Sequence, residues 1–158
     1  MKKKFLLLAA LSAVLTIAGC ATSGSNENQF SSFAGEGMPS ESDVARFCNS
    51  FGLLIVNGSY KTTLAYFDPD YVKEQHDENL GGRTEQFLAE FLFNSLDGKL
   101  IPKLNEIKAV KTENIRFNGR REAAATLFIT LKNGKSYTTD VTVLIYSKKI
   151  MYFLGAFG

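Results

Sequence analysis

The only histidine of the chain, His76, is the first candidate for chemistry because acidic residues surround it in the sequence. A carboxylate beside a histidine stabilises the imidazolium and orients the ring, so such a pair can act as a general acid or base. The stretch 76–82 is polar and ends in two glycines, which predicts a loop with a solvated histidine. The nearest acids in the sequence are Asp70, Glu74, Asp77 and Glu78.

Acids of the same region could also supply oxygen ligands to a calcium ion. Their spacing does not follow the calcium-loop pattern, and the sequence offers no second histidine for a histidine-rich metal site. We therefore expect no metal site and no cofactor. The acids considered are Asp68, Asp70, Asp77 and Glu78.

Cys48 is the second candidate, as a nucleophile. It lies on the apolar side of a predicted helix, with Val44 and Phe51 one turn away on either side. A thiol in apolar surroundings has a raised pKa and is unreactive. We therefore interpret Cys48 as a core residue.

Two segments could hold an anion. The first is Gly81-Gly82-Arg83-Thr84, which precedes a predicted helix whose first amides could bind a negative charge. The second is a cluster of Arg116, Arg120 and Arg121 around a predicted hairpin. We interpret the first as a loop followed by a helix cap at Thr84, and the second as a solvated turn that discourages edge pairing. The sequence contains no nucleophile elbow, phosphate loop or dinucleotide fingerprint.

Cys20 stands in the most specific pattern of the chain. Residues 2–4 are lysines, residues 5–17 form an uncharged apolar run, and the small pair Ala18-Gly19 precedes the cysteine. A basic start, an apolar middle and small residues at the end are typical of a secretory signal. The apolar run is too short to span a bilayer comfortably as a permanent helix.

The segment Leu15-Thr16-Ile17-Ala18-Gly19-Cys20 resembles the lipobox of bacterial lipoprotein precursors. The resemblance covers the first 20 residues. It implies that residues 1–19 are removed and that Cys20 is diacylated, becomes the first mature residue and anchors the chain to a membrane. Ala21 follows, not an aspartate, which implies the outer membrane if the cell has two membranes. The alternatives are an ordinary signal peptide with a chance cysteine, or an uncleaved anchor.

Removal of the signal would change the charge of the chain. The whole sequence has 18 basic and 16 acidic residues, and the first 19 residues contain three lysines and no acid. The remaining 139 residues of the 158 would therefore have 15 bases and 16 acids, a formal charge of −1. This balance argues against nucleic acid as a partner and gives no sign of a basic patch for an anionic membrane. With Cys20 acylated, Cys48 has no disulfide partner within the chain.

Residues 20–40 are mostly small and polar, without periodicity, and predict a flexible tether. About 20 residues of such coil span roughly 25 Å, enough to hold a domain near a membrane without docking it. The mature chain is long enough for one domain, which we place at residues 41–158.

Helices are predicted in the first half of this domain. The first begins at Ser40 or Ser42 and ends at Asn57-Gly58. A short helix over 59–67 follows, with Tyr60, Leu64 and Phe67 facing inward, and Asp68-Pro69 then starts a further turn or two through Gln75. Thr84 caps the next helix, which has one apolar side up to Leu96 and is closed by Asp97-Gly98.

Strands are predicted in the second half. They run over 107–117, with a bulge or bend near Val110, and over 123–131, 137–145 and 150–157. Asn118-Gly119, Asn133-Gly134 and Ser147-Lys148-Lys149 provide the three turns. Helices followed by a four-stranded antiparallel meander define an α+β domain in which a curved sheet packs on helices.

This order of elements resembles the cone-shaped fold of the nuclear-transport-factor-2-like superfamily, over about residues 41–158. The motif Lys61-Thr-Thr-Leu-Ala-Tyr-Phe-Asp-Pro-Asp70 contributes to the resemblance. That fold usually has a short hairpin before its long third helix, and residues 71–83 show no strand pattern. A cystatin-like sheet over a helix is the alternative. The resemblance implies a pocket between sheet and helices, for which Tyr66, Asp70 and His76 are the candidate residues. Thirteen phenylalanines lead us to expect a filled core there instead.

The sequence thus predicts a membrane-anchored cell-envelope lipoprotein with a small non-catalytic binding or scaffolding domain. The rival interpretation is a small-molecule-binding protein or enzyme that uses the pocket. A third is a subunit of an envelope machine that binds a protein partner through an edge strand or the open sheet face.

Overall fold

The computed structural model describes residues 37–94, 96 and 100–157. The predictions for Cys20, for most of the tether and for the stop at Asp97-Gly98 lie outside these residues. In this part of the chain seven helical elements lead into a four-stranded sheet, so the predicted α+β class is confirmed. In chain order the elements are α1 (Glu41–Val56), α2 (Tyr60–Thr63), η3 (Leu64–Tyr66), α3 (Pro69–Tyr71), η4 (Val72–Asn79), α4 (Thr84–Leu92), η5 (Leu104–Glu106), β1 (Ile107–Phe117), β2 (Glu122–Leu131), β3 (Ser136–Ile145) and β4 (Met151–Phe157).

Ser40 is the N-cap of helix α1, which is one of the two caps that the sequence predicted. The Ser40 hydroxyl accepts a hydrogen bond from the Asp43 amide, and the Asp43 carboxylate accepts one from the Ser40 amide, which is a complete capping box. These bonds to Ser40 lower the pKa of Asp43, with a smaller contribution from Arg46. At the other end Asn57 caps the helix, and Gly58 takes the left-handed conformation that ends it.

The chain between α1 and α4 contains more helix than the sequence predicted. Asp68 caps α3 through its carboxylate, with Pro69 at the first position, as expected. The helix does not stop at Gln75, because it continues as η4, a helix of π type, to Asn79. The predicted loop at 76–82 is therefore wrong for its first four residues. The remaining turn uses Gly81 and Gly82, both in the left-handed region that glycine tolerates.

Helix α4 differs from its prediction at both ends. Arg83 is its N-cap, and Thr84 is its first residue. Its last residue is Leu92, because Phe93 leaves the helical conformation and its ring enters the core against Tyr137, with the ring centroids 5.5 Å apart. Leu96, which the sequence placed on the apolar side of this helix, therefore lies beyond its end.

The sheet is the predicted meander, in the order β1-β2-β3-β4, with antiparallel pairing throughout. Alternate residues of β2 and β3 are buried on one face, as the period of two required. In β1 the register shifts between Ile107 and Ala109, so Ile107 and Val110 are both buried. This agrees with the bulge expected near Val110, and a second shift follows between Glu113 and Arg116.

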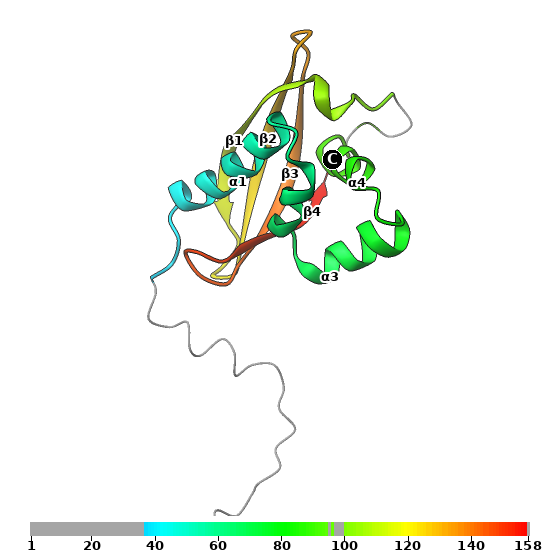
Figure 1. Cartoon of the computed structure of the whole chain (residues 1–158). Helices are drawn as coiled ribbons and strands as arrows, with labels where there is room; N and C mark the ends of the chain where they lie inside the picture. Colours follow the sequence, from blue (N-terminus) through cyan, green and yellow to red (C-terminus); the bar gives the residue numbers. More distant parts are fainter. Residues whose placement is uncertain (1–36, 95, 97–99, 158) are drawn as a thin grey trace, which may run out of the picture.

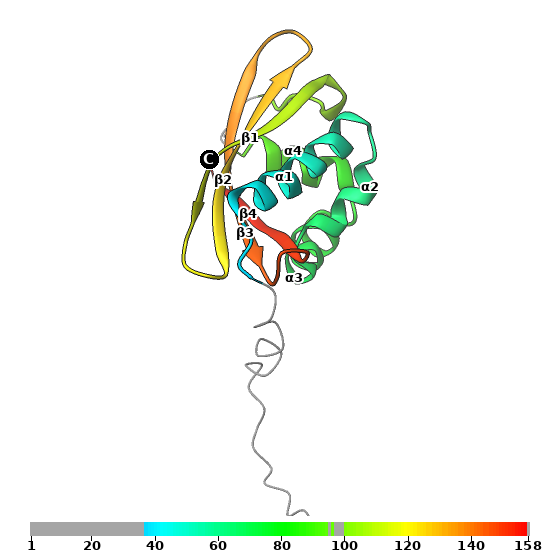
Figure 2. The same ribbon diagram turned by 90° about the vertical axis from the view of Figure 1, so that its left-hand side faces the viewer.

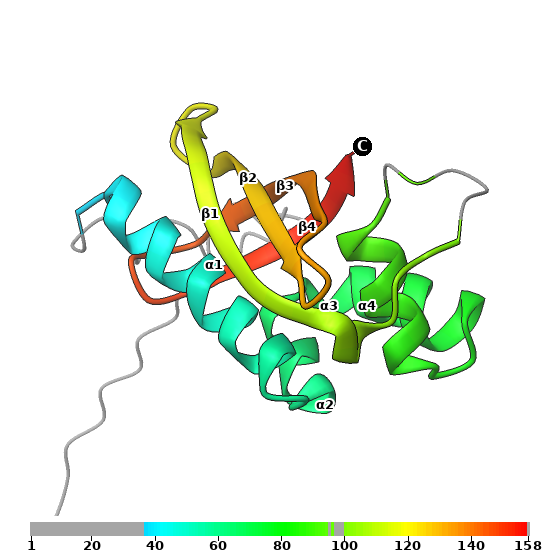
Figure 3. The same cartoon turned by 90° about the horizontal axis from the view of Figure 1, so that it is seen from above.

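All the helices cover one face of the sheet, and the other face is open, as Figure 2 shows most clearly. Figure 1 shows α1 crossing the sheet close to β1, with α4 on the side of β4. Helix α2 lies on the outer side of the helical layer, away from the sheet (Figure 2). From above, β1 arches over α1 (Figure 3). The core of this two-layer arrangement lies between α1, α4 and the inner face of the strands.

Helix α1 approaches β1 closely because Gly52 has no side chain. A Cβ atom at this position would lie 2.8 Å from the Cβ atom of Val110 and 3.2 Å from its carbonyl oxygen. Gly52 is buried within the helix, where glycine is otherwise unfavourable by about 1 kcal/mol relative to alanine. The close contact explains its presence there.

We predict that Gly52→Ala destabilises the fold, by about 1–3 kcal/mol, because the added methyl group pushes α1 away from β1. Urea denaturation of the full chain measures the change. Leu53→Ala is the control, since Leu53 is 63% exposed on the same helix and its truncation should change stability by less than about 0.5 kcal/mol. A stabilised Gly52→Ala variant would show that helix propensity outweighs the contact.

Candidate functional site

Phenylalanine rings fill the space between the sheet and the helices. The ring of Phe51 from α1 lies against Phe153 of β4, with centroids 4.9 Å apart. Phe67 packs at right angles to Phe91, with centroids 4.8 Å apart, and near-perpendicular packing is favourable for aromatic pairs. Phe51, Phe67 and Phe153 are at most 1% exposed. In the described part of the chain, these rings therefore fill the space between α1, α4 and β4, where the sequence predicted a filled core.

The backbone joins the helical layer to the sheet at the same place. Phe67 forms a bridge with Phe153, and the Asp68 amide donates to the Phe153 carbonyl at 2.9 Å. The segment after η3 thus runs along the β4 edge like a short extra strand. This contact fixes the position of Asp68, and with it the start of α3.

Tyr66, Asp70 and His76 do not meet in one site. Tyr66 is half-buried against Phe47 and lines a surface hollow of about 290 Å³ beside the β3–β4 turn. Asp70 is exposed, and its amide donates to the Asp68 carboxylate. Neither Asp70 nor His76 lines this hollow or the two other hollows found among the described residues.

His76 is a buried residue, 6% exposed, which corrects the expectation of a solvated loop histidine. Its Nδ1 atom lies 2.6 Å from Asp77 Oδ1, and its Nε2 atom lies 3.0 Å from Thr84 Oγ1. A carboxylate only accepts hydrogen bonds, so Nδ1 donates to Asp77. The ring edge also packs on Phe87, at a centroid distance of 5.6 Å.

A hydroxyl, an imidazole and a carboxylate in this order are also the parts of a nucleophilic relay. A relay needs a space beside the hydroxyl for a substrate, and Thr84 lines none of the described hollows. We therefore interpret the three residues as a link between η4 and α4. The sequence missed the link because the helical continuation of α3 through His76 was not predicted. Thr84 was singled out as a cap, but its hydroxyl contacts the histidine instead.

We predict that His76→Ala destabilises the fold by about 2 kcal/mol, because both hydrogen bonds and the Phe87 contact are lost and the Thr84 hydroxyl loses its partner. Urea denaturation measures the effect. The exposed Glu78, also on η4, provides the control variant Glu78→Ala, which should behave like the parent chain. Equal unfolding midpoints for the two variants would contradict the proposed link.

Cys48 is buried on α1, as predicted, and is a free cysteine. Burial raises the pKa of the Cys48 thiol to about 12, against a smaller opposing effect of a hydrogen bond with Thr112. The thiol is therefore protonated at neutral pH and is not a nucleophile.

The Gly81-Gly82-Arg83-Thr84 segment uses its own polar groups. The Gly82 amide donates to the His76 carbonyl at 2.8 Å, and the Arg83 side chain donates to the Leu80 carbonyl at 2.8 Å. The Thr84 amide donates to the Gly82 carbonyl. These groups close the turn between η4 and α4 and are not directed toward an anion.

A hollow of about 550 Å³, larger than the one beside Tyr66, was not predicted. It separates the outer side of α4 from the segment before η5. Burial, followed by the nearby charge of Glu85, raises the pKa of Tyr60 at its edge. Three distant parts of the sequence contribute to it, so no local pattern could have indicated it. Its lining residues are Tyr60, Glu85, Gln86, Ala89, Glu90, Ile101, Pro102, Lys103, Leu104 and Asn105.

Within the described part of the chain, no group of three or more histidine, cysteine, aspartate or glutamate residues could hold a metal ion. None of the helices in that part has the length and apolar character needed to cross a bilayer.

Comparison with known proteins returns no family model, no curated protein and no solved structure that matches this chain.

Proposed function

We propose that this protein is a cell-envelope lipoprotein, anchored to a membrane by lipid on Cys20, whose domain binds or scaffolds another envelope component without catalysing a reaction. The outer membrane is the proposed location in a cell that has two membranes. The resemblance to the nuclear-transport-factor-2-like cone remains part of this proposal and rests on the order of the elements.

The observation that carries the anchoring is the lipobox-like segment ending at Cys20, with its basic and apolar residues upstream. A single acyl chain binds a membrane only marginally, whereas two or three give durable anchoring, because each buried CH₂ group contributes about 0.8 kcal/mol. The polar residues after Cys20 suit a tether that leads to α1, where Ser40 starts the domain.

The packed interior supports a domain that works through its surface. Enzymes with the cone fold place their reactive groups between the sheet and the helices. In this domain phenylalanine rings occupy that space. The candidate residues of the rival interpretation are spread over three environments: a hollow for Tyr66, the open surface for Asp70 and a helix-to-helix link for His76. This separation favours the binding or scaffolding function over the enzyme.

We predict that Cys20→Ser in the full chain blocks lipidation and leaves the precursor unprocessed, because the acyl group is carried by the thiol sulfur. Metabolic labelling with a palmitate analogue, followed by gel analysis of the labelled chain, measures both effects. Cys48→Ser is the matched control and should be labelled and processed like the parent. A Cys20→Ser chain that is labelled and shortened normally would overturn the anchoring.

A further inference from the structure

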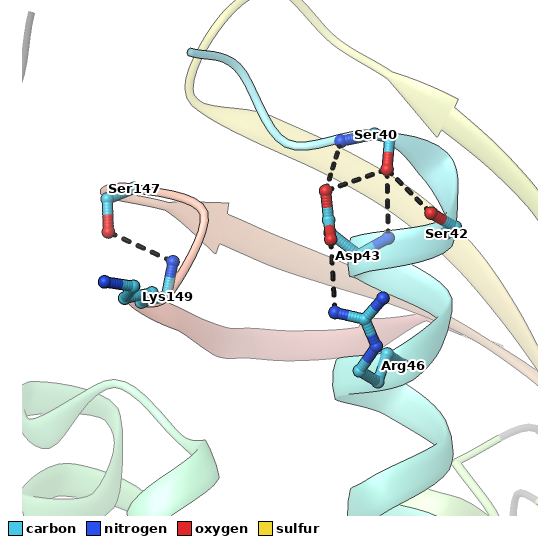
Figure 4. A network of polar contacts seen from close by, with 6 residues as sticks. All are labelled: Ser40, Ser42, Asp43, Arg46, Ser147 and Lys149. Carbon is cyan, nitrogen blue, oxygen red and sulfur yellow. Dashed lines mark hydrogen bonds and ion pairs between the residues drawn. The ribbon is translucent and has the colours of Figure 1, made fainter. Parts of the chain in front are cut away.

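The end of the domain at which the chain enters from the tether is basic and is shared by three segments. The antiparallel meander brings the β1–β2 turn and the β3–β4 turn to this end, where the Ile145 amide donates to the Arg121 carbonyl at 2.7 Å. The start of α1 lies beside them, since a Cβ atom placed on Gly37 would lie 3.9 Å from the Lys148 side chain. Figure 4 shows the first turn of α1 next to the β3–β4 turn.

Bases gather at this end although they are distant in the sequence. Six lysine and arginine residues lie here, and all six are exposed. Three acids lie on the same segments as these bases, and one of them, Asp43, forms an ion pair with Arg46 at 3.3 Å. The bases are Arg46, Arg116, Arg120, Arg121, Lys148 and Lys149, and the acids are Glu41, Asp43 and Glu122. We call this group of bases, with the turns that carry it, the basic end.

The acids of the domain are concentrated elsewhere. Residues 68–90, which form α3, η4 and α4, contain seven acids and two bases. Asp68 and Asp70 lie near the β3–β4 turn, because their charges, after burial, raise the pKa of Tyr146 in that turn. The other five acids follow on η4 and α4. The near-neutral total charge of the mature chain therefore hides a separation of charge that only the fold creates.

Exposed apolar side chains accompany the basic end. Met38, directly before α1, is 48% exposed, and Ile150, in the β3–β4 turn, is 39% exposed. Basic and apolar side chains together suit the interface of a bilayer with anionic lipids, which attracts each nearby lysine or arginine and accepts small apolar groups.

We propose that the basic end docks on anionic phospholipid headgroups of the membrane that holds the anchor. The inference depends on the proposed lipid anchor only because the anchor holds the domain near the membrane. The tether joins the domain at this end, so the anchored membrane is the nearest large surface to it. The segment 21–36 contains two acids and no base, so it has no positive charge that would attract it to anionic lipids. The attraction to these lipids therefore comes from the basic end. Docking turns the acidic helices toward the envelope space, where the hollow beside α4 is accessible.

The test measures the distance between this end and the lipid headgroups. The full lipidated chain, with a fluorophore on Asn118→Cys in the β1–β2 turn, is reconstituted in phosphatidylcholine vesicles with or without phosphatidylglycerol. Buried Cys48 does not compete for the label. We expect quenching by headgroup spin labels in the anionic vesicles, little in the neutral ones, and loss of quenching at high salt. A fluorophore on Lys135→Cys, in the β2–β3 turn at the opposite end of the sheet, should stay unquenched.

Charge variants separate specific docking from attraction of the whole chain. Arg120→Glu with Lys148→Glu should lower the docked fraction at least about tenfold, because each base near the surface contributes several-fold. Lys103→Glu with Lys111→Glu changes the net charge equally at exposed sites away from this end and should leave quenching unchanged. Equal quenching in neutral and anionic vesicles, or equal loss in both variants, would overturn the docking. A chain whose mass shows no lipid on Cys20 overturns the proposed anchor, while the quenching still decides the docking.

Discussion

The packing of Phe51, Phe67, Phe91 and Phe153 is the contact on which the rest of the domain depends. These rings come from α1, the segment after η3, α4 and β4, so they join each major helix to the sheet. Each buried phenylalanine contributes roughly 2–3 kcal/mol by leaving water. The described residues contain no disulfide, so aromatic packing carries the stability that some small domains take from cross-links.

Filling the interior in this way also limits what the domain can do. A fold of helices on a curved sheet can keep a ligand space between its layers, but rings that meet at 4.8–4.9 Å leave no such space at their contact. The groups available for recognition are then those on the surface. Two of them differ in net charge: the basic end beside Ser40, and the hollow beside α4, whose lining includes Glu85 and Glu90 against Lys103.

The strands were predicted well because their alternation, their turns and their pairing are all local. Ala123 to Leu131 on β2 and Thr139 to Ile145 on β3 bury alternate residues as the sequence indicated. The Ser40 cap of α1, one of the two caps predicted, and the Asp68-Pro69 start were local too, and both are confirmed. The errors lie between residues 76 and 96, where tertiary contacts decide: His76 is held by Thr84 across a turn, and Phe93 leaves α4 to reach Tyr137. The contact of Gly52 with Val110 had no local signal, because it joins residues far apart in the chain. The sequence showed only the arginine cluster of the β1–β2 turn, since the other bases of the basic end come from distant segments.

The central claim is that Cys20 carries the anchor and is the first residue of the working protein. The intact mass of the wild-type chain, extracted from membranes with detergent, tests it most directly. The account predicts a chain that starts at Cys20 and carries the added mass of a diacylglyceryl group. A chain that still starts at Met1, or one that contains an unmodified Cys20, would contradict it.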